Sequence, residues 1–356
     1  MSTKPLYVAA MSGGVDSTVA AALALESGAR VTGVTLILRD CDGNGGCGSD
    51  DREQVTRVAA QLGIEHQFLD LRREFREKVL EYSWNEYRAG RTPNPCAFCN
   101  FHLKFGLLAE HARALGADAM LTGHYAILDH EKGELRHAVD TSKDQVYFLA
   151  LLTREQLKFC RMPLGSLTKD EVRRRADVLG LENARKKESQ DACFGVPGEA
   201  FSQTLAAYFE AAPVPGEIVD ENGKVLGRHQ GIHLYTIGQR KGLGVAMGRP
   251  AYVTAIDAKT GRVVLSTDSS VLLRNIIEVD RVNMMADRPE QFQCEVQTRY
   301  RQKPVPATVT LLAGGRARLE LNSPVTAPAV GQVAAFYDGD LVLGGGIITQ
   351  TSQKEK

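Results

Sequence analysis

The chain has no excess of charge of either sign, because its 43 Lys and Arg residues are balanced by 43 Asp and Glu residues. Any contact with nucleic acid must therefore come from local basic clusters and not from the overall charge. No run approaches the roughly 18 apolar residues that a membrane-spanning helix needs, and the N-terminus lacks the basic and then apolar pattern of a secretory signal. We expect a cytoplasmic protein without a membrane partner.

The chain has few cysteines, with seven among its 356 residues. An odd number of cysteines spread over a long chain without a signal peptide argues against a disulfide framework. The only CxxC pair has no second CxxC partner, which argues against a closed zinc site. The cysteines therefore point to thiol chemistry or to a different kind of metal ligation.

The first half of the chain alternates between two patterns. Short β-branched runs at residues 30–38, 65–69 and 117–122 alternate with helical patterns at residues 50–62, 72–89 and 101–115. Glycines follow three helical patterns where the left-handed position after a helix falls, and these are Gly28, Gly63 and Gly116. This alternation predicts an α/β fold with a doubly wound parallel sheet.

The second half has a different texture, with short strands and turn signals in place of helices. Turns at residues 221–223 and 257–261 separate short apolar runs, which predicts hairpins. Alternating strands with scattered Gly and Pro then continue to about residue 350, which is typical of a small β-barrel. We expect domains at residues 1–205, 206–270 and 271–356: a nucleotide-binding domain with the cysteines, a β-rich central domain and a C-terminal β-barrel.

A glycine turn near the N-terminus predicts a phosphate site. Residues 11–17, MSGGVDS, follow an apolar run and precede an alanine-rich helical pattern. Two glycines expose successive backbone N–H groups, the hydroxyls of Ser12 and Ser17 add donors, and the helix start favours an anion. The P-loop pattern GxxxxGK[ST] is absent. The string resembles instead the SGGxDS loop of the ATP pyrophosphatases, which cleave ATP to AMP and pyrophosphate.

Ligands of doubly wound sheets bind beyond the carboxyl ends of the strands. The turn at Ser12, Leu36 and the segment at residues 122–124 all follow predicted strands. We therefore expect three strand ends to converge on one pocket.

Two cysteine segments carry candidate chemistry. Cys99 closes the CxxC that starts at Cys96, and we expect a helix to begin near Asn100, so that the helix dipole stabilises the Cys99 thiolate. Cys193 follows the basic residues 185–187, which would lower its pKa or bind RNA phosphate. The structural alternative is a buried cysteine in a loop.

The other cysteines have weaker signals. Cys41 and Cys47 flank a glycine-rich loop without metal-site spacing, and Cys160 and Cys294 lie among apolar or strand residues, which indicates packing.

Several further motifs occur in a fixed order. Together with the glycine turn, they resemble the tRNA-specific 2-thiouridylase family from about residue 6 to about residue 350. The segments that carry the resemblance are residues 11–17, 90–95, 99–100, 104–105, 122–125, 143–145, 189–191, 193–194 and 235–244.

The resemblance implies a reaction. ATP, with Mg²⁺, would adenylate the C2 oxygen of the wobble uridine of a tRNA, with lysine, glutamate and glutamine acceptors as the expected substrates. A persulfide on Cys193 would then deliver sulfur, and Cys99 would act as the nucleophile that forms a disulfide with Cys193. The sulfur would come from a donor protein or from sulfide.

The resemblance also implies roles for individual residues. The expected ATP-binding residues are Ala10, Met11, Ser12, Gly13, Gly14, Val15, Asp16, Ser17, Leu36 and Gly123. The expected tRNA-binding residues are Asn94, Pro95, Cys96, His124, Lys143, Asp144, Gln145, Arg299, Tyr300 and Gln332.

Two basic segments support RNA contact independently of the resemblance. Tyr300 is flanked by Arg299 and Arg301, as an aromatic platform beside cations would be, although charge on an exposed strand edge explains the same pattern. Arg240 and Lys241 lie in a glycine-rich segment that fails the GxGxxG spacing, and we expect them to contact phosphate.

One departure from the family pattern opens a second mechanism. Many members of the family carry Asp where this chain has Cys96. Cys96, Cys99 and Cys193 could together hold a [4Fe–4S] cluster with an open iron that binds sulfide. Sulfur would then pass to the activated uridine without a persulfide or a disulfide, and the sequence leaves both routes open.

Two alternatives from other classes remain. An amide- or guanidine-forming ATP pyrophosphatase predicts no role for Cys99 and Cys193. A non-catalytic RNA- or metal-binding protein predicts no ATP turnover, and predicts that Asp16→Ala leaves RNA binding unchanged.

Overall fold

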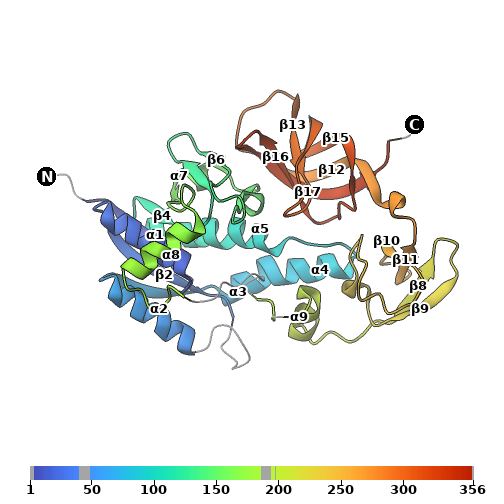
Figure 1. Cartoon of the computed structure of the whole chain (residues 1–356), viewed down its shortest axis with the longest axis horizontal. Helices are drawn as coiled ribbons and strands as arrows, with labels where there is room; N and C mark the ends of the chain where they lie inside the picture. Colours follow the sequence, from blue (N-terminus) through green and yellow to red (C-terminus); the bar gives the residue numbers. More distant parts are fainter. Residues whose placement is uncertain (1–3, 40–48, 186–193, 197, 355–356) are drawn as a thin grey trace.

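The computed structural model describes residues 4–39, 49–185, 194–196 and 198–354. Figure 1 shows three sheets arranged along an elongated molecule. The N-terminal parallel sheet and a small central sheet lie toward opposite ends, and a β-barrel lies against the helices between them. The predicted fold class, a parallel α/β sheet followed by a β-rich part and a barrel, is confirmed.

The N-terminal sheet has five parallel strands in the order β3-β2-β1-β4-β7. Its strands are β1 (Leu6–Ala10), β2 (Arg30–Ile37), β3 (Glu65–Asp70), β4 (Ala119–Leu121) and β7 (Cys160–Arg161). The chain runs outward from β1 to β3 and then returns to β4 on the other side of β1. This reversal at β1 and β4 is the point where such sheets bind ligands.

Both faces of this sheet are covered, because successive side chains of a strand point to opposite faces. Val8 and Met120 pack in the same cluster as Leu108 of α6. Ala9 packs with Ala21 of α1 in a second cluster. Near-continuous apolar strands with helices on both sides are what a buried parallel sheet requires.

The described helices up to residue 208 include the four predicted ones, one of which starts earlier than predicted, and four further helices after residue 145 that the sequence patterns did not predict. They are α1 (Val15–Glu26), α2 (Ser49–Gln61), α3 (Arg72–Phe75), η1 (Arg76–Glu81), α4 (Tyr82–Arg88), α5 (Pro95–Cys99), η2 (Asn100–Leu107), α6 (Leu108–Ala114), η3 (Val146–Leu149), α7 (Arg154–Lys158), α8 (Lys169–Val178) and α9 (Phe201–Tyr208). Helical backbone continues from α3 through α4 and from α5 through α6, with the π-helical stretches η1 and η2 inside. Gly28, Gly63 and Gly116 adopt φ of 88°, 68° and 74°, as predicted.

The central sheet contains both predicted hairpins. Its strands, in the order β10-β11-β8-β9, are β8 (Gly216–Asp220), β9 (Val225–His229), β10 (Tyr252–Asp257) and β11 (Arg262–Ser266), with the short helix η4 (Ile232–Leu234) between β9 and β10. The two hairpins join through a parallel pair, β11 with β8.

The barrel closes through a pairing of β12 with β17. Its six strands, in the order β12-β15-β14-β13-β16-β17, are β12 (Leu273–Met284), β13 (Gln291–Gln297), β14 (Val305–Leu312), β15 (Arg316–Thr326), β16 (Val333–Asp338) and β17 (Leu341–Ser352), and the short helix η5 (Ser269–Leu272) precedes them. Closure leaves no open edge between these six strands.

A hairpin from the first half extends the barrel sheet. Strands β5 (Ile127–Asp129) and β6 (Glu134–Arg136) pair with each other, and β6 pairs with β17. His137 N donates to Asp340 O at 2.9 Å, and Arg136 forms an ion pair with Asp340 at 2.8 Å. The barrel is thereby hydrogen-bonded to the N-terminal half. Within the described ranges, no helix combines the length and apolar character needed to cross a bilayer.

Candidate active site

The nucleotide loop, residues 11–17, joins β1 to α1 at the centre of the parallel sheet. Gly13 adopts a φ of 74°, which other residues rarely adopt, and Gly14 caps α1 with extended backbone. Ser12 N donates to Ser17 Oγ at 3.2 Å, and Ser17 Oγ donates to Gly14 O at 3.0 Å. The Ser17 hydroxyl thus braces the loop from within. The first N–H groups of α1 have no acceptor inside the helix, so this start suits a phosphate.

Asp16, in the first turn of α1, is held by two donors from distant parts of the chain. Lys169 Nζ lies 2.7 Å from Asp16 Oδ1 and 2.8 Å from Oδ2, and the Tyr125 hydroxyl donates to Oδ1 at 2.8 Å. The Lys169 side chain is only 7% exposed. The carboxylate is therefore fixed in place before any ligand arrives.

The three predicted strand ends do converge. Leu36 lies near the carboxyl end of β2, where Met11 N donates to Val34 O at 2.9 Å and Thr35 Oγ1 donates to Met11 O at 2.7 Å. Gly123, after β4, touches the loop from the other side. A Cβ on Gly123 would lie 2.8 Å from the backbone nitrogen of Ser17, so only glycine permits this approach.

His124 follows Gly123, and its surroundings disfavour the charged form of its ring. Burial, and next the Lys104 cation, hold its pKa well below the ordinary value. Its Nδ1 hydrogen-bonds with Thr122 Oγ1 at 3.0 Å, and its ring lies 5.5 Å from the ring of Phe105 in η2. His124 therefore connects the nucleotide loop to the helix that carries the CxxC.

A third distant side chain supports the nucleotide loop. Asn183 is fully buried, and its Nδ2 donates to Gly13 O at 3.2 Å and to Thr18 Oγ1 at 2.9 Å. Both contacts tie the loop to the segment that follows α8.

The CxxC pair lies on the first turns of α5, not before a helix. Asn94 caps α5, with its Oδ1 accepting from Ala97 N at 3.1 Å, and Pro95 is the first helical residue. The prediction that a helix begins near Asn100 is therefore wrong, and so is the placement of Cys99 at a helix start. Asn followed by Pro is a helix-start signal, and it lies five residues earlier than the apolar pattern that we used.

This correction changes which thiolate the helix dipole favours. The dipole acts mainly on the first turn, where Cys96 is the second residue, whereas Cys99 is the last residue of α5. The i, i+3 spacing places both sulfurs on one helix face. Cys99 is buried in the main hydrophobic cluster, and Cys96 is partly exposed.

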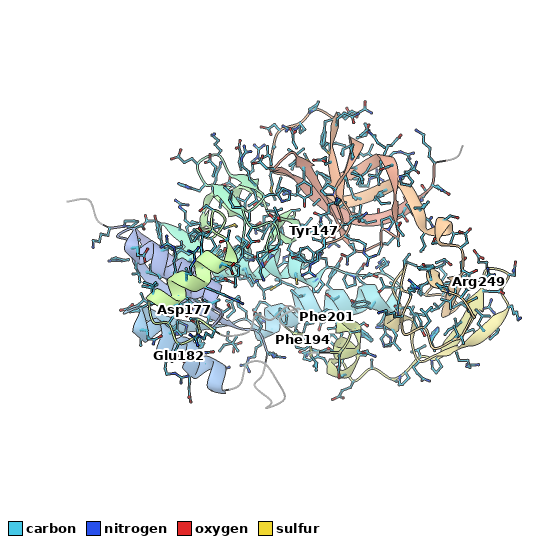
Figure 2. All side chains as sticks on the ribbon, in the orientation of Figure 1. Tyr147, Asp177, Glu182, Phe194, Phe201 and Arg249 are labelled. Carbon is cyan, nitrogen blue, oxygen red and sulfur yellow. The ribbon has the colours of Figure 1, made fainter. Side chains whose placement is uncertain are left out.

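The loop before α5 is clamped by the barrel. Thr92 N donates to Val330 O at 2.8 Å, and Gln332 Nε2 donates to Thr92 O at 3.0 Å and Pro93 O at 2.8 Å. The Tyr147 hydroxyl donates to Val333 O at 2.9 Å. Burial raises the pKa of Tyr147, and Figure 2 shows this residue where the barrel meets the helices. Gln332, a predicted tRNA contact, therefore positions residues 92–99, which are the loop before α5 and α5 itself with its CxxC. We call these residues the cysteine turn.

An aromatic group lies at the same junction. The Tyr300 ring, from the loop between β13 and β14, lies 4.5 Å from the ring of Phe148 and remains 37% exposed. The Arg301 guanidinium lies 5.3 Å from the Tyr300 ring, and the neighbouring Arg299 is exposed. The predicted cation and aromatic arrangement is therefore present at the surface.

The predicted tRNA-binding segment at residues 143–145 uses two of its side chains for internal contacts. The Asp144 carboxylate accepts from Ala138 N at 2.7 Å, and Gln145 Oε1 accepts from Tyr125 N at 3.1 Å. Lys143 is partly exposed. The segment links Tyr125, which holds Asp16, to the Tyr300 aromatic group.

Three predicted cysteines lie outside the described residues, and these are Cys41, Cys47 and Cys193. Phe194, which follows Cys193 in the chain, is buried in the same hydrophobic cluster as Cys99. Its ring lies 6.0 Å from that of Phe75 in α3, and Figure 2 shows it beside the helices.

The remaining cysteines of the described residues, Cys160 and Cys294, are free thiols whose charged form burial disfavours. Burial raises the pKa of both Cys160 and Cys294 to about 12. A thiol that stays protonated is a poor nucleophile and a poor metal ligand. Both therefore fit the packing role that their surroundings in the sequence indicate.

Among the described residues, no group of three or more His, Cys, Asp or Glu side chains is placed to hold a metal ion. The predicted cluster ligands include Cys193, so this part of the chain contributes Cys96 and Cys99 only. Two sulfurs on one helix face are compatible with a larger ligand set.

Sequence reasoning missed Lys169, Asn183 and Tyr147. The segment at residues 168–171 does carry a capping box, which the structure contains at the start of α8, but nothing in it shows that Lys169 reaches across to Asp16. Asn183 and Tyr147 have no local signal at all, because their roles depend on contacts with residues more than 150 positions away.

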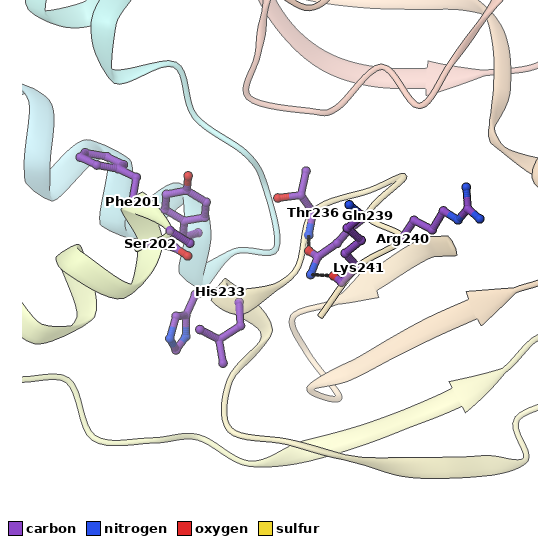
Figure 3. Close-up of a pocket in the computed structure, with 10 residues that line it drawn as sticks. Phe201, Ser202, His233, Thr236, Gln239, Arg240 and Lys241 are labelled. Atoms are coloured by element: carbon purple, nitrogen blue, oxygen red, sulfur yellow. Dashed lines mark hydrogen bonds between the residues drawn. The ribbon is translucent and has the colours of Figure 1, made fainter. Parts of the chain in front are cut away.

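A cavity of about 530 Å³ lies between α4, α9 and the central sheet region (Figure 3). Tyr87 is among the lining residues, and Phe201 lies on one side with Arg240 and Lys241 on the other. The Gln239 side chain stabilises the basic turn by hydrogen bonds to Thr236 N and Lys241 O, each at 3.0 Å. Aromatic rings opposite cations are the combination that nucleic acid binds.

Comparison with known proteins covers most of the chain. Three family models match consecutive segments: tRNA methyl transferase HUP domain at residues 6–196, tRNA methyl transferase PRC-barrel domain at residues 202–267 and Aminomethyltransferase beta-barrel domain at residues 274–348.

Two solved structures align with part of the chain, each at 17% identity and a TM-score of 0.36. A U34-tRNA thiolase NcsA from Methanococcus maripaludis with its [4Fe-4S] cluster matches over 59% of this chain and 66% of its own, and a 4-thiouridine synthetase in complex with RNA and ATP over 55% and 46%. Similarity at this level supports no conclusion about the chemistry of this chain.

Curated relatives are much more similar. The tRNA-specific 2-thiouridylase MnmA of Treponema denticola is 42% identical over 353 residues, which cover 95% of this chain and 96% of the relative. The protein of the same name from a Synechococcus species is 45% identical, and the match covers 97% of this chain and 98% of the relative. This chain therefore belongs to the tRNA-specific 2-thiouridylase family.

Proposed function

We propose that the protein catalyses the ATP-dependent 2-thiolation of the wobble uridine of tRNA. The observation that carries this proposal is one continuous helical segment. It begins at the CxxC of α5 and reaches the nucleotide loop through Phe105, whose ring lies 5.5 Å from that of His124. A phosphate site and a pair of cysteines are thereby held on one rigid support.

ATP would bind at the nucleotide loop with its phosphates at the start of α1. The backbone N–H groups after Gly13 and Gly14 would hold the pyrophosphate, and Gly123 and Leu36 would line the adenosine. The Asp16 carboxylate is an oxygen ligand of the kind that Mg²⁺ prefers, and Mg²⁺ there would offset the negative charge of the phosphates. In-line attack by the C2 oxygen of uridine on the α-phosphorus would release pyrophosphate and leave the oxygen as part of a good leaving group.

Sulfur would then be delivered by the cysteines. The outer sulfur of a persulfide on Cys193 would attack C2, and AMP would leave with the former C2 oxygen. The Cys99 thiolate would attack the inner sulfur and release 2-thiouridine, and Cys99 and Cys193 would become a disulfide. Two thiols lose the two electrons that the transferred sulfur gains, so a thiol reductant must restore the pair before the next turnover.

A cluster-based route is the second candidate, and the position of Cys96 supports it. Cys96 lies in the first turn of α5, where the helix dipole favours a thiolate, and a persulfide route needs no thiolate there. Cys96, Cys99 and Cys193 would hold a [4Fe–4S] cluster whose open iron would bind external sulfide, and no disulfide would form.

The tRNA would approach the junction between α5 and the barrel. Asn94, Pro95 and Cys96 would meet the target base after it leaves its stack, and His124, Lys143, Asp144, Gln145 and Gln332 would surround it. Arg299 and Tyr300 present a cation and an exposed ring beside this point. Acceptors for lysine, glutamate and glutamine, and a sulfur-donor protein or sulfide, are part of the same proposal.

The proposal extends to the division of the chain and to its location. We assign catalysis to residues 1–205, a β-rich central domain to residues 206–270 and tRNA contact to the barrel at residues 271–356. A cytoplasmic location is proposed because the tRNA substrate is read there.

The test is nucleoside mass spectrometry of unmodified tRNA after anaerobic incubation with the protein, ATP, Mg²⁺ and sulfide. Reactions run with reconstituted iron, without iron and with a persulfide donor. 2-Thiouridine that depends on iron supports the cluster, and 2-thiouridine without iron or only with the persulfide donor supports the disulfide route.

The same experiment separates the other function classes. ATP cleavage to AMP with no thiolated uridine in any reaction would favour an amide-forming enzyme. RNA binding without ATP turnover would favour a non-catalytic protein, and either result would overturn the proposal.

A further inference from the structure

Lys169 is a buried charge at the nucleotide loop that the chemistry above does not use. Its ammonium lies 2.7 and 2.8 Å from the two carboxylate oxygens of Asp16. The Lys169 side chain is 7% exposed, against 29% for Asp16, so water reaches the carboxylate more easily than the ammonium.

The place of Lys169 in its helix is unfavourable for a cation. It is the first residue of α8, where the helix dipole is positive and acidic residues are preferred. The backbone N–H of Lys169 donates to Asp140 Oδ2 at 2.9 Å, while its side chain turns toward α1. Residues that break a local rule of this kind are expected at functional sites.

Two helix starts meet at this point. Asp16 lies in the first turn of α1 and Lys169 in the first turn of α8, where the Asp140 carboxylate accepts from Lys169 N. If Asp16 turned to a metal ion, the Lys169 ammonium would lose its carboxylate partner beside the start of α1. A polyphosphate is the anion that balances it.

We propose that Lys169 exchanges partners when nucleotide binds. In the ligand-free protein the Lys169 ammonium pairs with the Asp16 carboxylate. With MgATP bound, the ammonium contacts the phosphates and the carboxylate turns to the magnesium ion. This inference rests on the proposed use of ATP and names Lys169 as a phosphate-contacting residue for that reaction. It predicts that the metal ion alone binds poorly and that nucleotide and metal ion bind together.

The experiment measures Mn²⁺ binding without nucleotide, by electron paramagnetic resonance, and MgATP binding by calorimetry. Lys169→Met releases Asp16 but removes the ammonium that would reach the phosphates. We expect its Mn²⁺ affinity to rise about tenfold and its MgATP affinity to fall about tenfold, which is within the usual range for coupled sites. In the thiolation assay the KM for ATP should rise more than kcat falls.

Two further variants make the test specific. Lys169→Arg keeps a cation that pairs with carboxylate in bidentate fashion, so it should bind Mn²⁺ no better than the wild type and retain most of the MgATP affinity. Lys158→Met removes an exposed lysine of α7 that pairs with Glu155, and it should change neither affinity. The arginine variant also keeps the inference testable if the methionine variant does not fold.

The outcomes separate this inference from the proposed function. If the wild type binds no MgATP, the proposed function itself is wrong. The exchange of partners is wrong if the wild type binds MgATP but Lys169→Met, compared with the wild type, gains no affinity for Mn²⁺ and loses none for MgATP. Tighter Mn²⁺ binding by Lys169→Arg would overturn it as well.

Discussion

The contact between Gly123 and the nucleotide loop leaves no room for a side chain. A Cβ would lie 2.8 Å from Ser17 N and 2.9 Å from the carbonyl carbon of Asp16. Gly123→Ala should therefore push the loop away from its position and lower the free energy of unfolding by about 1–3 kcal/mol, as overpacking does. ATP affinity, measured by calorimetry, should fall with it.

Gly116→Ala is the matched control for this change. Gly116 has a φ of 74°, so alanine is strained there by about 1–2 kcal/mol, but no atom lies near the added Cβ. This variant should lose stability and keep its ATP affinity. If Gly123→Ala and Gly116→Ala bind ATP with equal affinity, Gly123 does not support the nucleotide loop.

The lowered pKa of His124 predicts a dependence of the free energy of unfolding on pH. The folded-state pKa lies below the ordinary value of 6.5, so the unfolded chain binds a proton before the folded chain does as pH falls. Stability is fully present above about pH 6.5 and is lost as pH falls below it, by at most about 1.4 kcal/mol per pH unit.

Urea unfolding at pH 7 and pH 5.5 tests this prediction. His124→Gln keeps a polar side chain that does not titrate, so it should lose less stability on acidification than the wild type. An equal loss in both proteins would mean that His124 is accessible to protons in the folded state.

At the level of elements, the helix start at Asn94 sets the position of both cysteines. Its side chain is 4% exposed and caps α5 through Ala97 N. Asn94→Ala should cost about 1 kcal/mol of stability and disorder the first turn, where Cys96 lies. Thiolation should fall severalfold while ATP affinity stays unchanged, because the segment reaches the nucleotide loop only at Phe105, 11 residues further along the chain.

Thr153→Ala provides the control, since Thr153 caps α7 in the same way, with a capping box to Gln156. It should cost a similar amount of stability without loss of thiolation. A parallel loss of thiolation in both variants would trace the effect to stability alone.

The elements also show what a sequence pattern reveals and what it omits. The parallel strands and the hairpins were predictable because apolar periodicity and turn residues are local. The start of α5 differs from the predicted start near Asn100, because Asn94 and Pro95 together form a helix start that the apolar pattern does not show. The pairing of β6 with β17 joins residues 136 and 341, and strands of three residues carry no local signal for such a partner.

Over the whole molecule, the RNA surface should extend from the cysteine turn to the central region. Tyr87 lines the cavity of Figure 3 and Pro95 begins α5. These residues are eight positions apart in the chain, so their Cα atoms are at most about 28 Å apart. Residues 222–256 contain five Lys or Arg and no Asp or Glu, although the chain as a whole is neutral. Neither Arg240 nor Lys241 forms an ion pair with any carboxylate in the described segments.

Replacing Arg240 and Lys241 by alanine should therefore weaken tRNA binding. The affinity should fall, and the slope of log affinity against log salt should decrease by about 1 for each phosphate that no longer pairs with a cation. The control replaces Lys132 and Lys158, two exposed lysines outside this surface that pair with Asp129 and Glu155, and should leave the slope unchanged. Equal slopes for the two double variants would remove this surface from the account.

Contacts between distant parts of the chain explain why part of the site could not be predicted. The motifs predicted the nucleotide loop, Gly123 and the CxxC, since each has a local signature. Lys169 reaches Asp16 across 153 positions, and Gln332 reaches Pro93 across 239. Such contacts depend on the packing of whole elements, which a single sequence does not specify.

The central claim is that ATP activates the C2 oxygen of the wobble uridine for replacement by sulfur. An anticodon stem-loop with ¹⁸O at C2 of that uridine tests it most directly. After incubation with the protein, ATP, Mg²⁺ and a sulfur source, the account predicts one labelled AMP for each 2-thiouridine formed. Thiolation with unlabelled AMP, or with ADP as the product, would contradict it.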